Sequence, residues 1–111
     1  MTIEKFEDLL IWQKSKELTL LIYKAFELNK DFNFKKQIER ASVSIMNNIA
    51  EGFERRSNKD FRQFLFFAKG SSGEVRNMLH LAKELKYIKE DEFIELSLDI
   101  SKMTAGLIKK L

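Results

Sequence analysis

The segment Gln37–Arg56 reads QIERASVSIMNNIAEGFERR, and its pattern of apolar residues decides the class of fold. Apolar side chains recur here at steps of three and four, which places them on one face of an α-helix. Proline, which would interrupt such a helix, occurs nowhere among the 111 residues. The segment, together with the residues just before it, therefore predicts a long amphipathic helix. The apolar face of this helix comprises Phe34, Ile38, Ala41, Ile45, Ile49 and Phe53.

Short polar segments divide the rest of the chain into similar helices. Three breaks are expected, at Asn29–Asp31, Arg56–Asn58 and Tyr87–Lys89. At the second break, Ser57 followed by Asp60 resembles a capping box, in which a serine hydroxyl accepts from a first-turn amide. Asp8 is a candidate cap for the first helix.

Each segment between these breaks carries its own apolar stripe. The first stripe comprises Leu9, Trp12, Thr19, Tyr23 and Phe26, and it is widened by Leu18, Ile22 and Ala25. The third comprises Phe61, Ala68, Val75 and Ala82, with a second seam of Phe64, Leu65, Ser72, Met78, Leu79 and Leu85. The fourth comprises Phe93, Leu96, Ile100, Met103, Leu107 and Leu111. We expect four helices of about 20 to 30 residues, and their short connections make neighbours antiparallel. The prediction is an all-α, antiparallel up-down-up-down four-helix bundle that forms a single domain over residues 1–111.

Composition narrows the class of protein. The chain has no cysteine, which excludes disulfides, thiolate metal sites and cysteine nucleophiles. Its 20 basic and 17 acidic residues give a net charge of +3, which permits nucleic-acid binding without requiring it. Leu18–Tyr23 falls far short of the roughly 20 apolar residues of a membrane span, and Met1–Asp8 mixes charges unlike a signal peptide. We therefore expect a cytoplasmic protein that does not enter a membrane.

Residues that could support catalysis are few. His80 is the only histidine, and Asn77 stands where a Glu-x-x-His metal motif would need glutamate. The segment Gly70–Gly73 (GSSG) lacks the Gly-Lys-Ser/Thr ending of a phosphate loop, so we interpret its small residues as the place where another helix approaches closely. The sequence predicts no catalytic residue, no metal and no cofactor, and hence a protein that is not an enzyme.

A polar stripe borders the apolar face of the second helix. It consists of Arg40, Ser44, Asn48, Glu51 and Arg55, and Ser71 and Glu74 lie on the matching flank of the third helix. Such stripes usually form interhelical hydrogen bonds and ion pairs. The expected pairs join Arg40 or Arg55 to Glu74, and Ser44 or Asn48 to Ser71. A ligand-binding role for some of these side chains remains the alternative.

Three phenylalanines crowd the start of the third helix. Phe64, Phe66 and Phe67 fall within four residues, and at about 100° per residue they cannot all face one side of a helix. At least one should lie outside the core, where an exposed ring favours a surface for self-association or a partner. The alternative is that Phe66 or Phe67 lies along a neighbouring helix at the edge of the core.

The turn after the second helix is strongly basic. Arg55, Arg56, Lys59 and Arg62 lie within eight residues, partly offset by acidic neighbours. One such turn is a weak phosphate-binding site, but several copies in a ring would bind nucleic acid more strongly, because each neutralised phosphate releases counterions. We predict these four residues as the nucleic-acid contacts.

Several motifs together resemble one bacterial family, the four-helix-bundle proteins encoded by intervening sequences of 23S rRNA genes. The opening Phe6–Leu9 with Trp12–Lys14 is similar, as are the central motifs Gln37–Ile45 and Asn48–Phe53 and the third-helix motif running from Phe61 through Glu74. Met46 departs from the pattern, since many relatives have proline there, and its presence suggests a straighter helix. The resemblance spans nearly the whole chain.

This resemblance implies a four-helix bundle, often a ring-shaped homopentamer, without catalytic activity. It extends to the basic pentameric accessory proteins of diversity-generating retroelements, which bind a reverse transcriptase and nucleic acid. The leading hypothesis is thus a homo-oligomer that offers a basic surface to RNA, DNA or a nucleic-acid enzyme. The alternative is a structural or adaptor oligomer that binds only protein partners.

Overall fold

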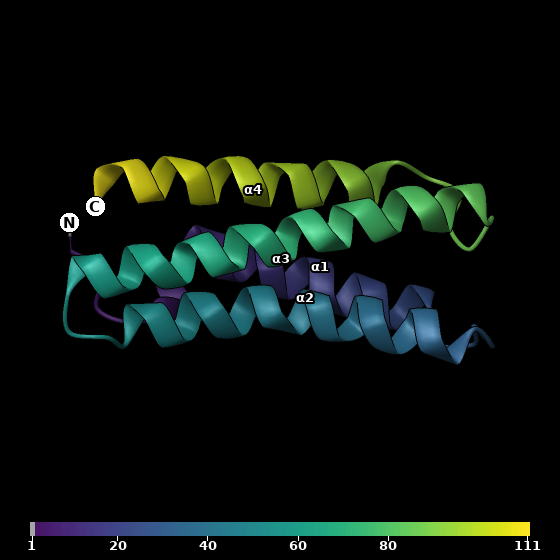
Figure 1. Cartoon of the computed structure of the whole chain (residues 1–111), viewed down its shortest axis with the longest axis horizontal. Helices are drawn as coiled ribbons and strands as arrows, with labels where there is room; N and C mark the ends of the chain where they lie inside the picture. The colour runs from purple at the N-terminus through teal and green to yellow at the C-terminus, as the bar shows by residue number, and fades with distance from the viewer. Residues whose placement is uncertain (1) are drawn as a thin grey trace.

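The computed structural model describes residues 2–111 as four helices that lie side by side in a bundle of 42 × 20 × 20 Å (Figure 1). A short 3-10 turn, η1 (Phe6–Asp8), precedes α1 (Leu10–Ala25), α2 (Phe32–Phe53), α3 (Asn58–Glu84) and α4 (Glu92–Lys110). Successive helices run in opposite directions, so the start of α1 and the end of α4 lie at the same end of the bundle. The predicted all-α, up-down-up-down bundle is confirmed.

The helix ends follow local side-chain chemistry at two of the three predicted breaks. Ser57 Oγ accepts a hydrogen bond from the amide of Asp60, and Asp31 Oδ1 accepts one from the amide of Phe34. Both satisfy amides that have no partner within the helix. The expectation for Asp8 is wrong, because Asp8 lies within η1 and Leu9 precedes α1 without a side-chain cap.

Because η1 takes up residues just before Leu10, α1 has 16 residues, fewer than the expected 20 or more. By comparison, α2 has 22 residues and α3 has 27. In α2, Met46 occupies the middle of a continuous helix, as its lack of proline predicts.

The apolar stripes meet in one continuous core that receives side chains from all four helices. Leu18, Ile45, Leu65 and Ile100 are fully buried, one from each helix. Tyr23 and Ala25 are the exposed members of the predicted first stripe, and 45% of the surface of Tyr23 remains accessible. Within residues 2–111, no helix is long and apolar enough to cross a membrane.

Small hydroxyl residues allow neighbouring helices to approach inside this core. The hydroxyl of Thr19 on α1 donates to the carbonyl of Ser15 on the same helix at 2.8 Å and shares its hydrogen with the carbonyl of Ser42 on α2 at 3.2 Å. Ser72 Oγ on α3 donates to the carbonyl of Ser97 on α4 at 2.9 Å. Because buried hydroxyls need such partners, these bonds fix where one helix lies along the next. The interpretation of the GSSG segment as a close helix approach is therefore correct for Ser72.

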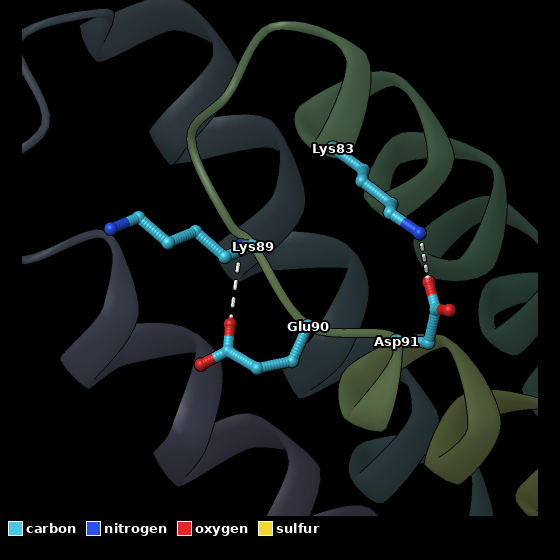
Figure 2. A network of polar contacts seen from close by, with 4 residues as sticks. All are labelled: Lys83, Lys89, Glu90 and Asp91. Carbon is cyan, nitrogen blue, oxygen red and sulfur yellow. Dashed lines mark hydrogen bonds and ion pairs between the residues drawn. The ribbon is translucent and has the colours of Figure 1, made fainter.

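The loop between α3 and α4 is held by polar contacts (Figure 2). Lys83 near the end of α3 pairs with Asp91 at the start of α4, and the amide of Lys89 donates to the carboxylate of Glu90 at 3.1 Å. Lys86 adopts a positive φ of 64° where the chain leaves α3, a backbone conformation that ends helices. The predicted break at Tyr87–Lys89 lies within this loop.

Candidate functional site: the surfaces of the second and third helices

The polar stripe of α2 contacts α3 through serine hydroxyls. Ser44 Oγ and Ser71 Oγ share a hydrogen bond of 2.9 Å, and Asn48 Nδ2 donates to Ser44 Oγ at 3.1 Å and to the Ser44 carbonyl at 2.9 Å. Since Ser44 Oγ accepts from Asn48, its own hydrogen is free to point toward Ser71. The three side chains form a small half-buried chain of hydrogen bonds between the two helices.

Among residues 2–111, the charged members of the stripe form no ion pair between α2 and α3. Arg55, just beyond the end of α2, pairs with Glu51 on α2 at 3.0 Å. Neither Arg40 nor Glu74 takes part in an ion pair within residues 2–111. The expected pairing of Arg40 or Arg55 with Glu74 is therefore wrong, and the hydrogen bond that joins the helices at this stripe connects neutral groups.

Arg55 also contacts α3 through an aromatic ring. Its guanidinium carbon lies 4.7 Å from the centre of the Phe64 ring, within the range of a cation–π interaction. The Phe64 ring in turn meets Phe67 edge-on, with 5.9 Å between ring centres. Arg55 is thus held by a carboxylate and a ring, which leaves less of its charge available to an outside phosphate.

Gly52 lets α2 and α3 approach each other beside this contact. A Cβ atom placed on Gly52 would lie 2.5 Å from Phe64 Cβ and 3.1 Å from an edge carbon of the Phe61 ring. Real carbon atoms do not come so close, so only glycine fits. The spacing of the two helices next to the basic turn therefore depends on this residue.

The four predicted nucleic-acid contacts divide into two pairs. Arg62 Nη2 donates to the carbonyl of Leu111 at 2.9 Å, which ties the start of α3 to the end of α4. Arg55 is engaged as described above. Arg56 and Lys59 are exposed, and neither forms an ion pair among residues 2–111. The structure thus leaves Arg56 and Lys59 as the cations of this turn that could meet a phosphate.

The phenylalanines of α3 separate as the helical spacing predicts. Phe66 is 52% exposed and Phe67 is 50% exposed, whereas Phe64 is partly covered at the edge of the core. The expectation that at least one ring lies outside the core is confirmed for Phe66 and Phe67.

Phe66 belongs to a longer uncharged surface, which we call the outer face of α3. By helical spacing it comprises Phe66, Gly70, Gly73, Asn77 and Leu81, on the side opposite the buried Ala68, Leu79 and Ala82. Leu81 is 50% exposed, and no atom lies within 4 Å of a Cβ placed on Gly70 or Gly73. Packing within the chain therefore does not require these two glycines, contrary to the sequence-based interpretation.

A second group of exposed residues lies between α1 and α2, and of its members only Arg40 was predicted from the sequence as a site residue. Tyr23, Lys36 and Arg40 line one hollow there, with Asn47 further along α2. Tyr23 was predicted to lie in the apolar stripe of the first helix. Its helical spacing does not reveal that it lies at the exposed edge of that stripe. The sequence contains one sign of this group, because two basic residues, Lys36 and Arg40, are four residues apart on a predicted helix.

Metal-binding side chains are not clustered in the described part of the chain. His80 is exposed, and residues 2–111 contain no group of three or more histidine, aspartate or glutamate side chains that could hold a metal ion. The groups on the two helix surfaces described above are exposed cations, exposed aromatic rings and neutral hydrogen-bonding side chains.

Comparison with known proteins places this arrangement in a family. Residues 7–109 match the family described as 23S rRNA-intervening sequence protein. The chain belongs to that family. The resemblance noted from the sequence motifs is thereby confirmed over nearly the whole chain.

A solved structure supports the same family assignment. It is a protein of unknown function from the S23 ribosomal protein family of Bacteroides thetaiotaomicron, with a TM-score of 0.83 and 30% sequence identity. The similarity covers 90% of this chain and 99% of that one. No match is found among curated proteins. The family and the fold are therefore established.

Proposed function

We propose that this family member is a non-enzymatic, homo-oligomeric module that presents clustered basic turns to RNA or DNA. The observation that carries the proposal is the position of the outer face of α3 directly after the basic turn. Lys59 lies in the first turn of α3, and Phe66 follows seven residues later, about 10 Å along the helix axis. Copies that pack through this face bring their basic turns together.

Self-association accounts for the apolar groups left on the surface. Half-exposed Phe66 and Leu81 lie at the two ends of the uncharged outer face of α3, on either side of its open glycines. Exposed large apolar side chains of this kind favour an interface. On α1, Leu10 and Leu20 are also exposed, at 56% and 61%. Two separate apolar surfaces allow one copy to use α3 and the next to use α1.

The arrangement of the helices favours a closed ring. Both α1 and α3 pack against α2 and α4, and within residues 2–111 no Cα atom of α1 lies within 8 Å of a Cα atom of α3, so these two helices occupy diagonal corners of the bundle. Contacts between the outer sides of α1 and α3 are head-to-tail, and such contacts close into rings when the rotation permits. The family resemblance favours five subunits.

Clustering strengthens a basic surface that is weak in one copy. Arg56 and Lys59 supply two available cations per chain, and each phosphate neutralised on duplex nucleic acid adds about 0.9 to the slope of log affinity against log salt. In a ring of several copies, this salt-dependent contribution is multiplied by the number of basic turns, one per copy, that a single nucleic-acid molecule can contact. We therefore expect binding of structured RNA or DNA that weakens steeply with salt.

The test combines mass and binding measurements on purified protein freed of nucleic acid. Sedimentation should give a species several times the 13.1 kDa of one chain. The double variant Arg56→Ala/Lys59→Ala should lose affinity for an RNA hairpin, while Lys89→Ala/Lys102→Ala, which removes the same charge elsewhere, should not. A monomer at micromolar concentration would overturn the oligomer, and absence of salt-dependent retention would overturn the nucleic-acid role.

A second candidate is an adaptor oligomer that binds only protein, such as a reverse transcriptase. The exposed ring of Phe67 beside the outer face of α3 favours it, because aromatic rings are enriched at protein interfaces. This candidate predicts the same oligomer without salt-sensitive affinity for RNA or DNA. The binding measurement above therefore separates the two.

A further inference from the structure

A hollow of about 410 Å³ lies along the groove between α1 and α2, away from the basic turn. We call it the Tyr23 hollow, and the lining residues that matter here are Tyr23 from α1 and Lys36, Glu39, Arg40, Val43 and Asn47 from α2. Arg40 lies 13 residues before the end of α2, about 20 Å along the helix. The Tyr23 hollow is therefore a surface separate from Arg56 and Lys59.

Two unpaired cations border the Tyr23 hollow. Lys36 and Arg40 are exposed and neither forms an ion pair among residues 2–111. They are four residues apart on one helix, where like charges repel and weaken the helix slightly. The same two side chains line a second hollow of about 440 Å³, with Asn33 and Gln37. Lys36 and Arg40 thus lie between two open hollows, where an anion could contact both.

The acidic groups nearby do not neutralise this pair. Glu39 lines the Tyr23 hollow and is its only carboxylate among the lining residues. Lys35 adds another positive charge close by, and its Nζ donates to the carbonyl of Glu27 at 3.1 Å rather than to a carboxylate. The local balance is positive, which favours a negatively charged ligand.

Tyr23 gives the hollow an aromatic platform that the basic turn lacks. Its side chain is 45% exposed, and a ring beside cations is the combination that proteins use to stack bases while holding phosphates. Gln37 and Asn47 add amide groups on either side, which can donate to and accept from the edges of unpaired bases. At the basic turn, by contrast, Phe61 packs against the core.

We propose that the Tyr23 hollow binds single-stranded nucleic acid, with a phosphate between Lys36 and Arg40 and a base against the ring of Tyr23. This proposal rests on the proposed function, because both name nucleic acid as the ligand. It adds a second surface, the Tyr23 hollow, that accepts unpaired nucleotides. A chain with both surfaces would hold a structured segment at the basic turn and an adjoining single strand along the α1–α2 groove.

The test measures fluorescence anisotropy of a labelled single-stranded oligonucleotide of about eight nucleotides, within the site sizes of such proteins. The protein is the full chain in its natural oligomeric state. Lys36→Ala/Arg40→Ala should weaken binding about tenfold or more, whereas Lys102→Ala/Lys109→Ala, with the same loss of charge on α4, should change it less than about twofold. Arg40→Glu should weaken binding further than Arg40→Ala.

Stacking is tested separately at Tyr23. Tyr23→Phe keeps the ring and should bind as the parent does, while Tyr23→Leu should bind about tenfold more weakly. Thermal unfolding of each variant checks that it folds, and Tyr23→His, which keeps a ring, replaces Tyr23→Phe if that variant is unstable. Equal binding by Tyr23→Leu and Tyr23→Phe would overturn base stacking, and equal losses in the two double variants would overturn the site.

Two further measurements identify the ligand and separate this inference from the proposed function. Inorganic phosphate that competes as well as the oligonucleotide does would reduce the hollow to a simple anion site and overturn the proposal. An RNA hairpin is titrated in parallel with Arg56→Ala/Lys59→Ala. If the parent binds the hairpin but not the single strand, only the Tyr23 hollow fails; if it binds the single strand but not the hairpin, only the basic turn fails.

Discussion

The hydroxyl of Tyr87 donates a hydrogen bond of 2.7 Å to Oδ2 of Asp31, although the two residues are 56 positions apart. The other oxygen of the same carboxylate accepts from the amide of Phe34 and caps α2. Asp31 therefore joins the start of α2 to the loop between α3 and α4. The ring of Tyr87 completes the contact, since it packs edge-on against Phe26 and Phe34 at centre distances of 6.3 and 5.4 Å.

This double use of Asp31 predicts unequal effects of two substitutions. Asp31→Ala removes both the helix cap and the bond to Tyr87, and loss of an N-cap alone costs about 1 kcal/mol of folding free energy. Tyr87→Phe removes only the bond and keeps the ring in its aromatic cluster. Urea unfolding should therefore rank the parent above Tyr87→Phe and Tyr87→Phe above Asp31→Ala. Equal stability of the two variants would mean that the cap contributes nothing.

The same bond makes a prediction about pH. The hydrogen bond to Asp31, followed by desolvation and the nearby negative charge, raises the pKa of Tyr87 above its ordinary value of 10.0. A group with a raised pKa in the folded state stabilises the fold fully below its unfolded pKa, and this contribution is lost as pH rises through the folded pKa. The stabilisation from Tyr87 should thus be complete at neutral pH and disappear in strongly alkaline solution.

The measurement is an absorbance titration of tyrosine ionisation in a Tyr23→Phe background, where Tyr87 is the only tyrosine. Its midpoint should lie above that of a free tyrosine, and Asp31→Asn should lower it. A midpoint unaffected by Asp31→Asn would show that the carboxylate does not control the tyrosine.

These long-range contacts mark the limit of sequence-based prediction. The positions of the breaks and the Ser57 cap depend on residues within one turn of each other, so periodicity and composition suffice to predict them. The partners of Arg62 and Tyr87 are 49 and 56 positions away, and they depend on where two helix ends meet in space. The sequence shows the basic turn as a run of charges. Only the structure shows that, within residues 2–111, Arg55 and Arg62 are engaged by other groups of the chain, whereas Arg56 is not.

Gly52 provides the clearest steric prediction. Gly52→Ala places a methyl group 2.5 Å from Phe64 Cβ, so α2 and α3 must separate, and overpacking of this kind costs about 1–3 kcal/mol of folding free energy. Gly106→Ala on α4 is the matched control, because its Cβ would meet no atom within 4 Å and alanine favours a helix over glycine by about 1 kcal/mol. Chemical unfolding should show opposite signs for the two; a stabilised Gly52→Ala would contradict the close approach.

The hydroxyl contact between α2 and α3 predicts coupling between its two residues. Ser44→Ala and Ser71→Ala each remove one partner of the 2.9 Å bond, and a half-buried hydroxyl left without its partner costs more than the loss of both. A double-mutant cycle should therefore give a coupling energy of about 0.5–1.5 kcal/mol. Additive losses would mean that the two serines contribute independently and that the stripe does not set the position of α2 along α3.

The outer face of α3 predicts a separation of assembly from folding. Phe66 is 52% exposed and opposite the core, so Phe66→Glu should leave the helical bundle intact while placing a charge in the proposed contact between copies. Burying a charge without a partner costs several kcal/mol, enough to dissociate an oligomer at micromolar concentration. Sedimentation should give single chains of 13.1 kDa, with unchanged circular dichroism. Lys102→Glu on α4 controls for the change of charge and should remain assembled; an assembled Phe66→Glu would place the contact elsewhere.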